Sequence, residues 1–188
     1  MRAAVFLDRD GVLVESIVGP DGVARPPSSL DDVVLTPDAM SATTALRDAG
    51  FVLVVVTNQP DVARNMTPRA VVKAINDHVL EQLRLDAVYA CLHDGDGCGC
   101  RKPKPGMLRD AARELELDLT ASWLIGDRWV DIGAAAAAGV RSVLLERAYS
   151  WRVAGGAVPP DDLRPDFTTA ALADAAAIVA GTPAPSSS

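Results

Sequence analysis

The chain has 188 residues, 49% of them hydrophobic, which is enough for one buried core and short for two. Charged residues make up 23%, a proportion typical of globular proteins that excludes a disordered chain. A net charge of -7 with 4% aromatic residues excludes the electrostatic footprint of a nucleic-acid-binding protein, and no apolar run is long enough to span a membrane.

Predicted strands and helices alternate along the chain. Continuous apolar runs predict strands over 3–7, 51–56, 87–90, 122–125 and 140–145. Start signals such as Thr36-Pro37 and Thr67-Pro68, and stop signals such as Gly50 and Gly139, predict helices over 37–49, 68–83, 105–115, 130–138 and 169–179. The alternation predicts an α/β doubly wound parallel sheet in one domain, residues 1–180, followed by a disordered low-complexity tail at 181–188.

In such a sheet, ligands bind beyond the carboxyl ends of the strands, so the residues that follow each strand indicate function. Asp8 and Asp10 follow the first strand. They form either an acidic turn or a magnesium site with a carboxylate nucleophile. Thr57, Asn58 and Gln59 follow the second strand, where they either solvate its end or donate hydrogen bonds to a phosphate.

Two further segments complete the candidate site. Asp127 follows the fourth strand, with Asp131 four residues later, and either serves as a helix N-terminal charge or faces the first acid pair as a metal ligand. Arg101 and Lys102 precede two prolines that fix the backbone. An anionic nucleophile, cations and hydroxyl donors at one sheet edge are what phosphoryl transfer requires.

The four motifs resemble those of the haloacid dehalogenase superfamily of phosphohydrolases: Asp8-x-Asp10, Thr57, Lys102 and Gly126-Asp127-x-x-x-Asp131. The resemblance implies a Rossmann-like core and catalysis through an aspartyl-phosphate, in which Asp8 is the nucleophile and Asp10 the general acid and base. It also implies Mg²⁺ held by Asp8, the Asp10 backbone carbonyl and Asp127. The residues expected to hold the transferring oxygens or to support the metal are Thr57, Lys102 and Asp131. Those expected at the substrate are Arg9, Ser16, Gly19, Asn58, Gln59, Arg101 and Arg128.

All three cysteines lie within ten residues, together with one of the two histidines: Cys91, His93, Cys98 and Cys100. Three thiolates and an imidazole are a usual complement for structural zinc, and four protein ligands leave no open position for catalysis. A disulfide would leave one cysteine over and strain a Cys-x-Cys pair. The sequence therefore favours a short zinc-binding loop, which runs directly into the basic segment 101–102.

With this loop the chain is similar to the D-glycero-D-manno-heptose 1,7-bisphosphate 7-phosphatases and to the related histidinol-phosphate phosphatases. Segment 101–107 is more similar to the heptose enzymes, which implies removal of the 7-phosphate. Histidinol phosphate or another small phosphorylated metabolite is the alternative substrate. Pro60, Asp61 and Asn65 depart from the family pattern beside the phosphate loop. A non-enzymatic receiver domain uses similar residues but places its acceptor Asp later in the chain. The intact set of acids, Thr and Lys argues against an inactive zinc scaffold.

Only 46 residues separate Asp10 from Thr57, so we expect no cap domain. The polar stretch 15–29 is expected either to select the substrate or to be an ordinary surface loop. We expect the short apolar start, broken at Asp8, not to act as a signal peptide, and we expect a cytoplasmic protein with reduced cysteines. Its expected partner is a small phosphorylated sugar, without nucleic acid or membrane, in a monomer or weak homo-oligomer.

Overall fold

The computed structural model describes residues 1–153 and 156–182. Its central sheet has six parallel strands in the order β5-β4-β1-β6-β7-β8. The strands are β1 (Ala4–Leu7), β4 (Val52–Asn58), β5 (Ala87–Cys91), β6 (Trp123–Gly126), β7 (Arg141–Leu145) and β8 (Phe167–Thr169). Because β1 lies between β4 and β6, the residues that follow these three strands meet at one edge of the sheet.

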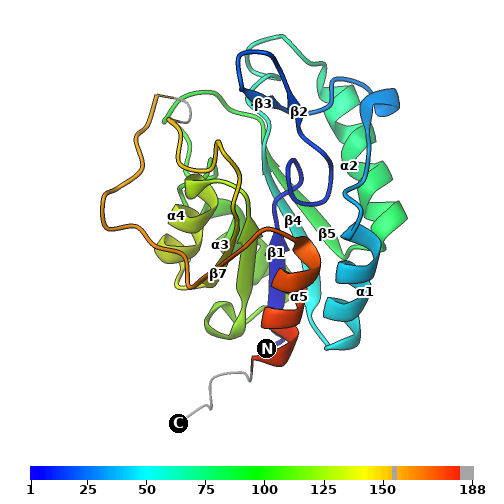
Figure 1. The fold of residues 1–188 in the computed structure, drawn as a ribbon, viewed down its shortest axis with the longest axis vertical. Coiled ribbons are helices and arrows are strands. Elements are labelled where there is room, and N and C mark those ends of the chain that lie inside the picture. Colours follow the sequence, from blue (N-terminus) through cyan, green and yellow to red (C-terminus); the bar gives the residue numbers. More distant parts are fainter. Residues whose placement is uncertain (154–155, 183–188) are drawn as a thin grey trace.

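Helices cover both faces of the sheet (Figure 1). The cluster on one face joins residues of α1 (Ala39–Asp48), α2 (Arg69–Leu83) and α5 (Leu172–Gly181). The cluster on the other face joins residues of α3 (Gly106–Leu115) and α4 (Trp129–Ala138). This three-layer arrangement confirms the predicted α/β doubly wound fold, and within residues 1–153 and 156–182 the segment between β1 and β4 holds only a hairpin, a short 3-10 turn and α1.

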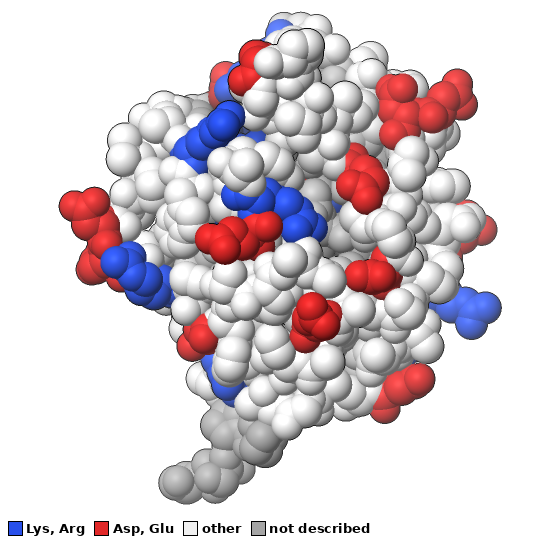
Figure 2. Space-filling view, in the orientation of Figure 1, with Lys and Arg blue, Asp and Glu red and all other residues white. Residues whose placement is uncertain are grey.

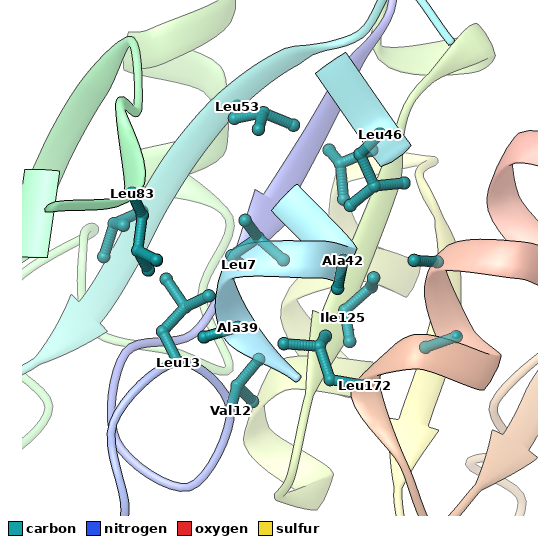
Figure 3. Close-up of a cluster of buried hydrophobic side chains, with 14 of the residues drawn as sticks. Leu7, Val12, Leu13, Ala39, Ala42, Leu46, Leu53, Leu83, Ile125 and Leu172 are labelled. Atoms are coloured by element: carbon teal, nitrogen blue, oxygen red, sulfur yellow. The ribbon is translucent and has the colours of Figure 1, made fainter. Parts of the chain in front are cut away.

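The alternation of side chains along β1 explains why its whole sequence is apolar. Val5 and Leu7 belong to the cluster beneath α1 and α5, whereas Ala4 and Phe6 belong to the cluster beneath α3 and α4. Successive strand residues point to opposite faces, so a strand covered on both sides needs apolar residues at every position. Figure 3 shows Leu7 among helix side chains that include those of α1.

The structure differs from the sequence prediction in its smaller elements. Stretch 15–29 contains a hairpin, β2 (Ile17–Val18) with β3 (Ala24–Arg25), which lies beyond the carboxyl end of β1 (Figure 1). Strand β8 was not predicted, because it is a three-residue edge strand that is largely exposed. It occupies the start of the predicted last helix, which begins only at Leu172 and continues to Gly181. Short 3-10 turns are η1 (Leu30–Asp32) and η2 (Leu119–Ala121).

The prediction that a disordered tail begins at Gly181 is wrong, because Gly181 is the last residue of α5. Positions 183–188 of the predicted tail lie outside the described residues. Within the described part of the chain, no helix combines the length and the apolar character that crossing a bilayer requires.

Candidate functional site

The carboxyl ends of β1, β4 and β6 border a cavity of about 400 Å³. Its lining includes Asp8, Asp10 and Thr57, together with Lys102 from the segment before α3. Four arginines also line it: Arg25, Arg64, Arg101 and Arg128. In Figure 2, Lys and Arg atoms gather near the centre of the face shown, beside acidic atoms. Asp61 and Asp96 line it as well, so five cationic side chains face four acidic ones, a slight excess of positive charge in a protein that is acidic as a whole.

Lys102 joins two of the acids that the sequence predicts at this site. Its buried ammonium lies 3.0 Å from Asp8 Oδ1 and 2.5 Å from Asp131 Oδ1, and it donates to the Val56 carbonyl. Burial favours the neutral amine, but the two carboxylates outweigh it and hold the pKa of Lys102 above its usual range. Burial also raises the pKa of Asp131 to about 6, although Lys102 opposes the shift. The lysine is thus kept charged next to Asp8.

The two carboxylate oxygens of Asp127 have different surroundings. One of its oxygens, Oδ2, accepts a hydrogen bond of 2.7 Å from the Tyr149 hydroxyl. The other, Oδ1, is buried and has no hydrogen-bond partner among the described residues. Oxygen atoms of Asp8, Asp127 and Asp131 lie within 4.8 Å of one another. Burial, with repulsion from Asp8 and Asp131, raises the pKa of Asp127 well above its usual range. A hard divalent cation would relieve this repulsion, so the residues fit Mg²⁺.

Asp10 is held in place by its neighbours. The guanidinium of Arg9 donates from Nε and Nη2 to its two oxygens, each at 3.0 Å, and Gln59 Nε2 donates to Oδ2 at 2.6 Å. Burial raises the pKa of Asp10, although Arg9 lowers it. A raised pKa favours the protonated form that a general acid requires.

Of the residues that were predicted to contact substrate, some line the cavity and others do not. Ser16, Asn58, Arg101 and Arg128 line the cavity. Arg9 and Gln59 do not: both are buried, with Arg9 also donating to Asn76 and Gln59 to Thr57. Gly19 likewise lies outside the lining, in the turn of the β2–β3 hairpin. Arg9 and Gln59 therefore hold Asp10 and Thr57, which do line the cavity.

The predicted zinc ligands gather at the end of β5. Sγ of Cys91 lies 3.7 Å from Sγ of Cys98 and 3.2 Å from Sγ of Cys100, and Nδ1 of His93 lies 3.3 Å from the Cys100 sulfur. Two sulfurs on a tetrahedral zinc ion are about 3.7 Å apart, given Zn–S bonds of about 2.3 Å. The cysteines are free rather than disulfide-bonded. The donor set fits zinc.

The loop that carries the Cys and His cluster, residues 91–100, is hydrogen-bonded to the basic segment of the cavity. Arg101 donates to the His93 carbonyl at 3.3 Å, and Lys104 donates to the Cys98 carbonyl at 2.9 Å. Asn58, at the end of β4, then exchanges two 3.0 Å hydrogen bonds with the backbone of Lys102. An ordered loop therefore fixes both Arg101 and Lys102 against the sheet.

Sequence reasoning missed several residues of this region. Tyr149 and Ser150 follow β7, and the Ser150 hydroxyl donates to the Asp127 carbonyl at 2.6 Å. Arg25 and Arg64 line the cavity from the hairpin and from the loop after β4. The rule that pointed to Asp8 and Asp127 also applies to β7, and inspection of the residues that follow this strand would have found Tyr149.

Gly11 is required by the close approach of the first loop to Asp127. A Cβ at this position would lie 2.0 Å from Asp127 Oδ2, and φ is +86°. We expect Gly11→Ala to displace the Asp127 carboxylate and to weaken Mg²⁺ binding by about 10- to 100-fold, as when a metal ligand loses its support. Isothermal titration with Mg²⁺ measures the effect.

Gly50→Ala is the matched control for this variant. Gly50 also has a positive φ, +90°, but nothing lies within 4 Å of its missing Cβ. It should carry the same kind of backbone strain and bind Mg²⁺ as the unsubstituted protein does. Equal losses in both variants would mean that backbone strain, rather than displacement of Asp127, is responsible.

Comparisons with known proteins place this geometry in a family. Residues 27–139 match the profile of haloacid dehalogenase-like hydrolases. The chain is 33% identical to the D-glycero-beta-D-manno-heptose-1,7-bisphosphate 7-phosphatase of Pseudomonas aeruginosa, over 86% of this chain and 91% of the relative. It is 34% identical to the Escherichia coli K12 protein of the same name, over 77% and 78% of the two chains.

Solved structures agree with the sequence comparisons. The D,D-heptose 1,7-bisphosphate phosphatase of Bordetella bronchiseptica, crystallised with magnesium and phosphate, superposes with a TM-score of 0.75. It is 32% identical in sequence, and the match covers 95% of this chain and 98% of that one. The fold and the sequence therefore point to the same relatives.

Proposed function

This chain belongs to the haloacid dehalogenase-like hydrolase family, and from that premise we propose that it removes the 7-phosphate of D-glycero-D-manno-heptose 1,7-bisphosphate. The observation that carries the proposal is the position of Asp8. It follows β1 at the cavity, 3.0 Å from the Lys102 ammonium and beside the Asp127 oxygen that has no hydrogen-bond partner in residues 1–153 and 156–182. Relatives that share one name over most of this chain support the choice of substrate.

In the proposed reaction, Asp8 attacks phosphorus and forms an aspartyl-phosphate. Asp10, held by Arg9 and Gln59, gives its proton to the leaving sugar oxygen and then takes one from the water that hydrolyses the intermediate. Lys102 and Thr57 hold the transferring oxygens, which gain charge in the transition state.

Two metals are proposed for different tasks. Asp8, Asp127 and the Asp10 backbone carbonyl would hold Mg²⁺, which supplies positive charge where carboxylate and phosphate meet. Asp131 supports this arrangement through Lys102. Zinc, on Cys91, His93, Cys98 and Cys100, would be structural because its four positions are filled.

Two arginines support a bisphosphate substrate. Arg101 and Arg128 line the cavity, and neither takes part in an ion pair with residues 1–153 or 156–182. Guanidinium groups bind phosphate through paired, charge-assisted hydrogen bonds, so a second phosphate suits them. Histidinol phosphate carries an ammonium group, which these cations would repel. We therefore favour the bisphosphate over this alternative.

Initial rates of phosphate release with Mg²⁺ test the proposal. We expect a higher kcat/KM for heptose 1,7-bisphosphate than for histidinol phosphate. A preference for histidinol phosphate would leave the proposed reaction mechanism unchanged and would assign the protein to amino-acid metabolism. Turnover of neither compound would contradict the proposed substrate class and direct attention to Pro60, Asp61 and the hairpin beside the cavity.

Arg101→Ala tests how the second phosphate is recognised. We expect KM for the bisphosphate to rise about 10- to 100-fold, the loss typical of a hydrogen bond to a charged group, with a smaller effect on kcat. KM for heptose 7-phosphate, which lacks that group, should change little. Arg113→Ala, on the exposed side of α3, is the matched control. Equal rises in KM for both substrates would contradict this role for Arg101.

We also propose one catalytic domain over residues 1–180 and a cytoplasmic location. Three thiolate ligands bind zinc only when they are reduced, which the cytoplasm favours.

A further inference from the structure

We propose that Tyr149 is a positioning residue that joins the magnesium site to the cation that recognises substrate. The proposal rests on the function inferred above, and it concerns a residue outside the four motifs. Tyr149 follows β7, is 8% exposed and lies in a segment that sequence periodicity does not single out. Its two ends contact different parts of the site.

The hydroxyl of Tyr149 fixes Asp127. It donates to Oδ2 at 2.7 Å, which leaves Oδ1 as the oxygen without a partner among the described residues. A Cβ on Gly11 would lie 2.9 Å from this hydroxyl, so the first loop, Asp127 and Tyr149 are in close packing. One oxygen is thus occupied and the other is kept for a cation, which is the usual task of a residue that supports a metal ligand.

The ring of Tyr149 fixes Arg128. The guanidinium carbon of Arg128 lies 5.0 Å from the ring centroid, within the range of a cation–π contact. Arg128 Nη2 also donates to the Ala24 carbonyl of β3 at 3.3 Å. The arginine is therefore held between the ring and the hairpin, at the wall of the cavity.

Neighbouring contacts hold Tyr149 itself. The next residue, Ser150, donates to the Asp127 carbonyl and accepts from the backbone of Arg147. Two residues later, the Arg152 carbonyl accepts from the indole of Trp129, at the start of α4. The segment after β7 is thus tied to the loop after β6, and the tyrosine has little freedom to leave Asp127.

Two substitutions separate the functions of hydroxyl and ring. Tyr149→Phe removes only the hydroxyl. We expect Mg²⁺ to bind the substrate-free protein about 10-fold more weakly by isothermal titration, and the rise in Tm on adding Mg²⁺ to shrink. Tyr149→Leu removes the ring as well, and KM for the bisphosphate should then rise further than in the Phe variant. Tyr89→Phe is the matched control, since its hydroxyl donates to Glu114 at the surface.

The Mg²⁺ dependence distinguishes positioning from simple stabilisation. If Tyr149 only stabilises the fold, the Phe variant will lose Tm equally with and without Mg²⁺ and bind Mg²⁺ normally, which overturns the proposal. Equal KM values in the Phe and Leu variants would overturn the role of the ring. If the unsubstituted protein bound no Mg²⁺, the proposed function would fail together with this inference. If the unsubstituted protein and Tyr149→Phe bind Mg²⁺ equally well, the inference about Tyr149 is overturned and the proposed function still stands.

Discussion

Asp8→Asn is expected to lower kcat by about 10⁵-fold or more, as removal of a nucleophile does in other enzymes that form covalent intermediates. The amide keeps the size of the carboxylate and can still accept from Lys102, which lies 3.0 Å from Asp8 Oδ1. It cannot form an acyl phosphate. The variant should therefore fold as the parent does and fail in the first chemical step.

Circular dichroism and thermal unfolding verify the fold of this variant. Trapping with radiolabelled substrate should show phosphorylated protein for the parent and none for Asp8→Asn. Asp77→Asn, which removes an exposed carboxylate on α2, should retain full activity. Parental turnover by Asp8→Asn would exclude this residue as the nucleophile.

His93→Ala is expected to release zinc and to lower kcat/KM about 100-fold. His93 contributes one of four clustered donors, and its carbonyl accepts from Arg101. Without the ion, the loop no longer fixes the segment that carries Lys102. A displacement of about 1 Å at a catalytic group can cost about 100-fold in rate.

His78→Ala is the control, because His78 is exposed on α2 and outside the cluster. Mass spectrometry of metals should give about one zinc per chain for the parent and for His78→Ala, and much less for His93→Ala, since four ligands bind one ion. A parent protein purified without chelator and free of zinc would contradict the structural role of the loop. Full activity of zinc-free His93→Ala would show that catalysis does not depend on the zinc ion.

Local spacing and strand order account for what the sequence predicted. The fold class follows from apolar strands that alternate with capped helices, and the sheet confirms it. Strand order then brings Asp8 and Thr57 to the lining of one cavity and an oxygen of Asp127 to within 4.8 Å of one of Asp8. The clustering of the four proposed zinc ligands is predictable because they lie within ten residues, so a short loop is enough to bring them together.

Side-chain direction was harder to predict. Arg9 lies between Asp8 and Asp10 in sequence, and both acids line the cavity. Near the end of a strand, adjacent residues point to opposite sides, and Arg9 is buried against Asn76. Its guanidinium contacts Asp10 from within the protein rather than from the cavity. Although Arg9 lies next to two cavity residues in the sequence, it does not itself line the cavity.

Tyr149 and the hairpin depend on contacts between distant segments. Arg128, beyond β6, meets Ala24 of the hairpin and the ring of Tyr149 beyond β7. No periodic pattern marks such contacts, since each involves loops more than 20 residues apart in the chain. The place of Tyr149 after β7 makes it a candidate in the sequence, but its partners are identified only when the loops beyond β1, β6 and β7 are folded over one sheet edge.

The most direct measurement is ³¹P NMR of heptose 1,7-bisphosphate during turnover with Mg²⁺. The two phosphates give separate signals, one from the anomeric position and one from the primary alcohol. We predict that the 7-phosphate signal disappears as inorganic phosphate grows, while the anomeric signal persists on the product. Loss of the anomeric signal first, or no change in either, would contradict the proposed function.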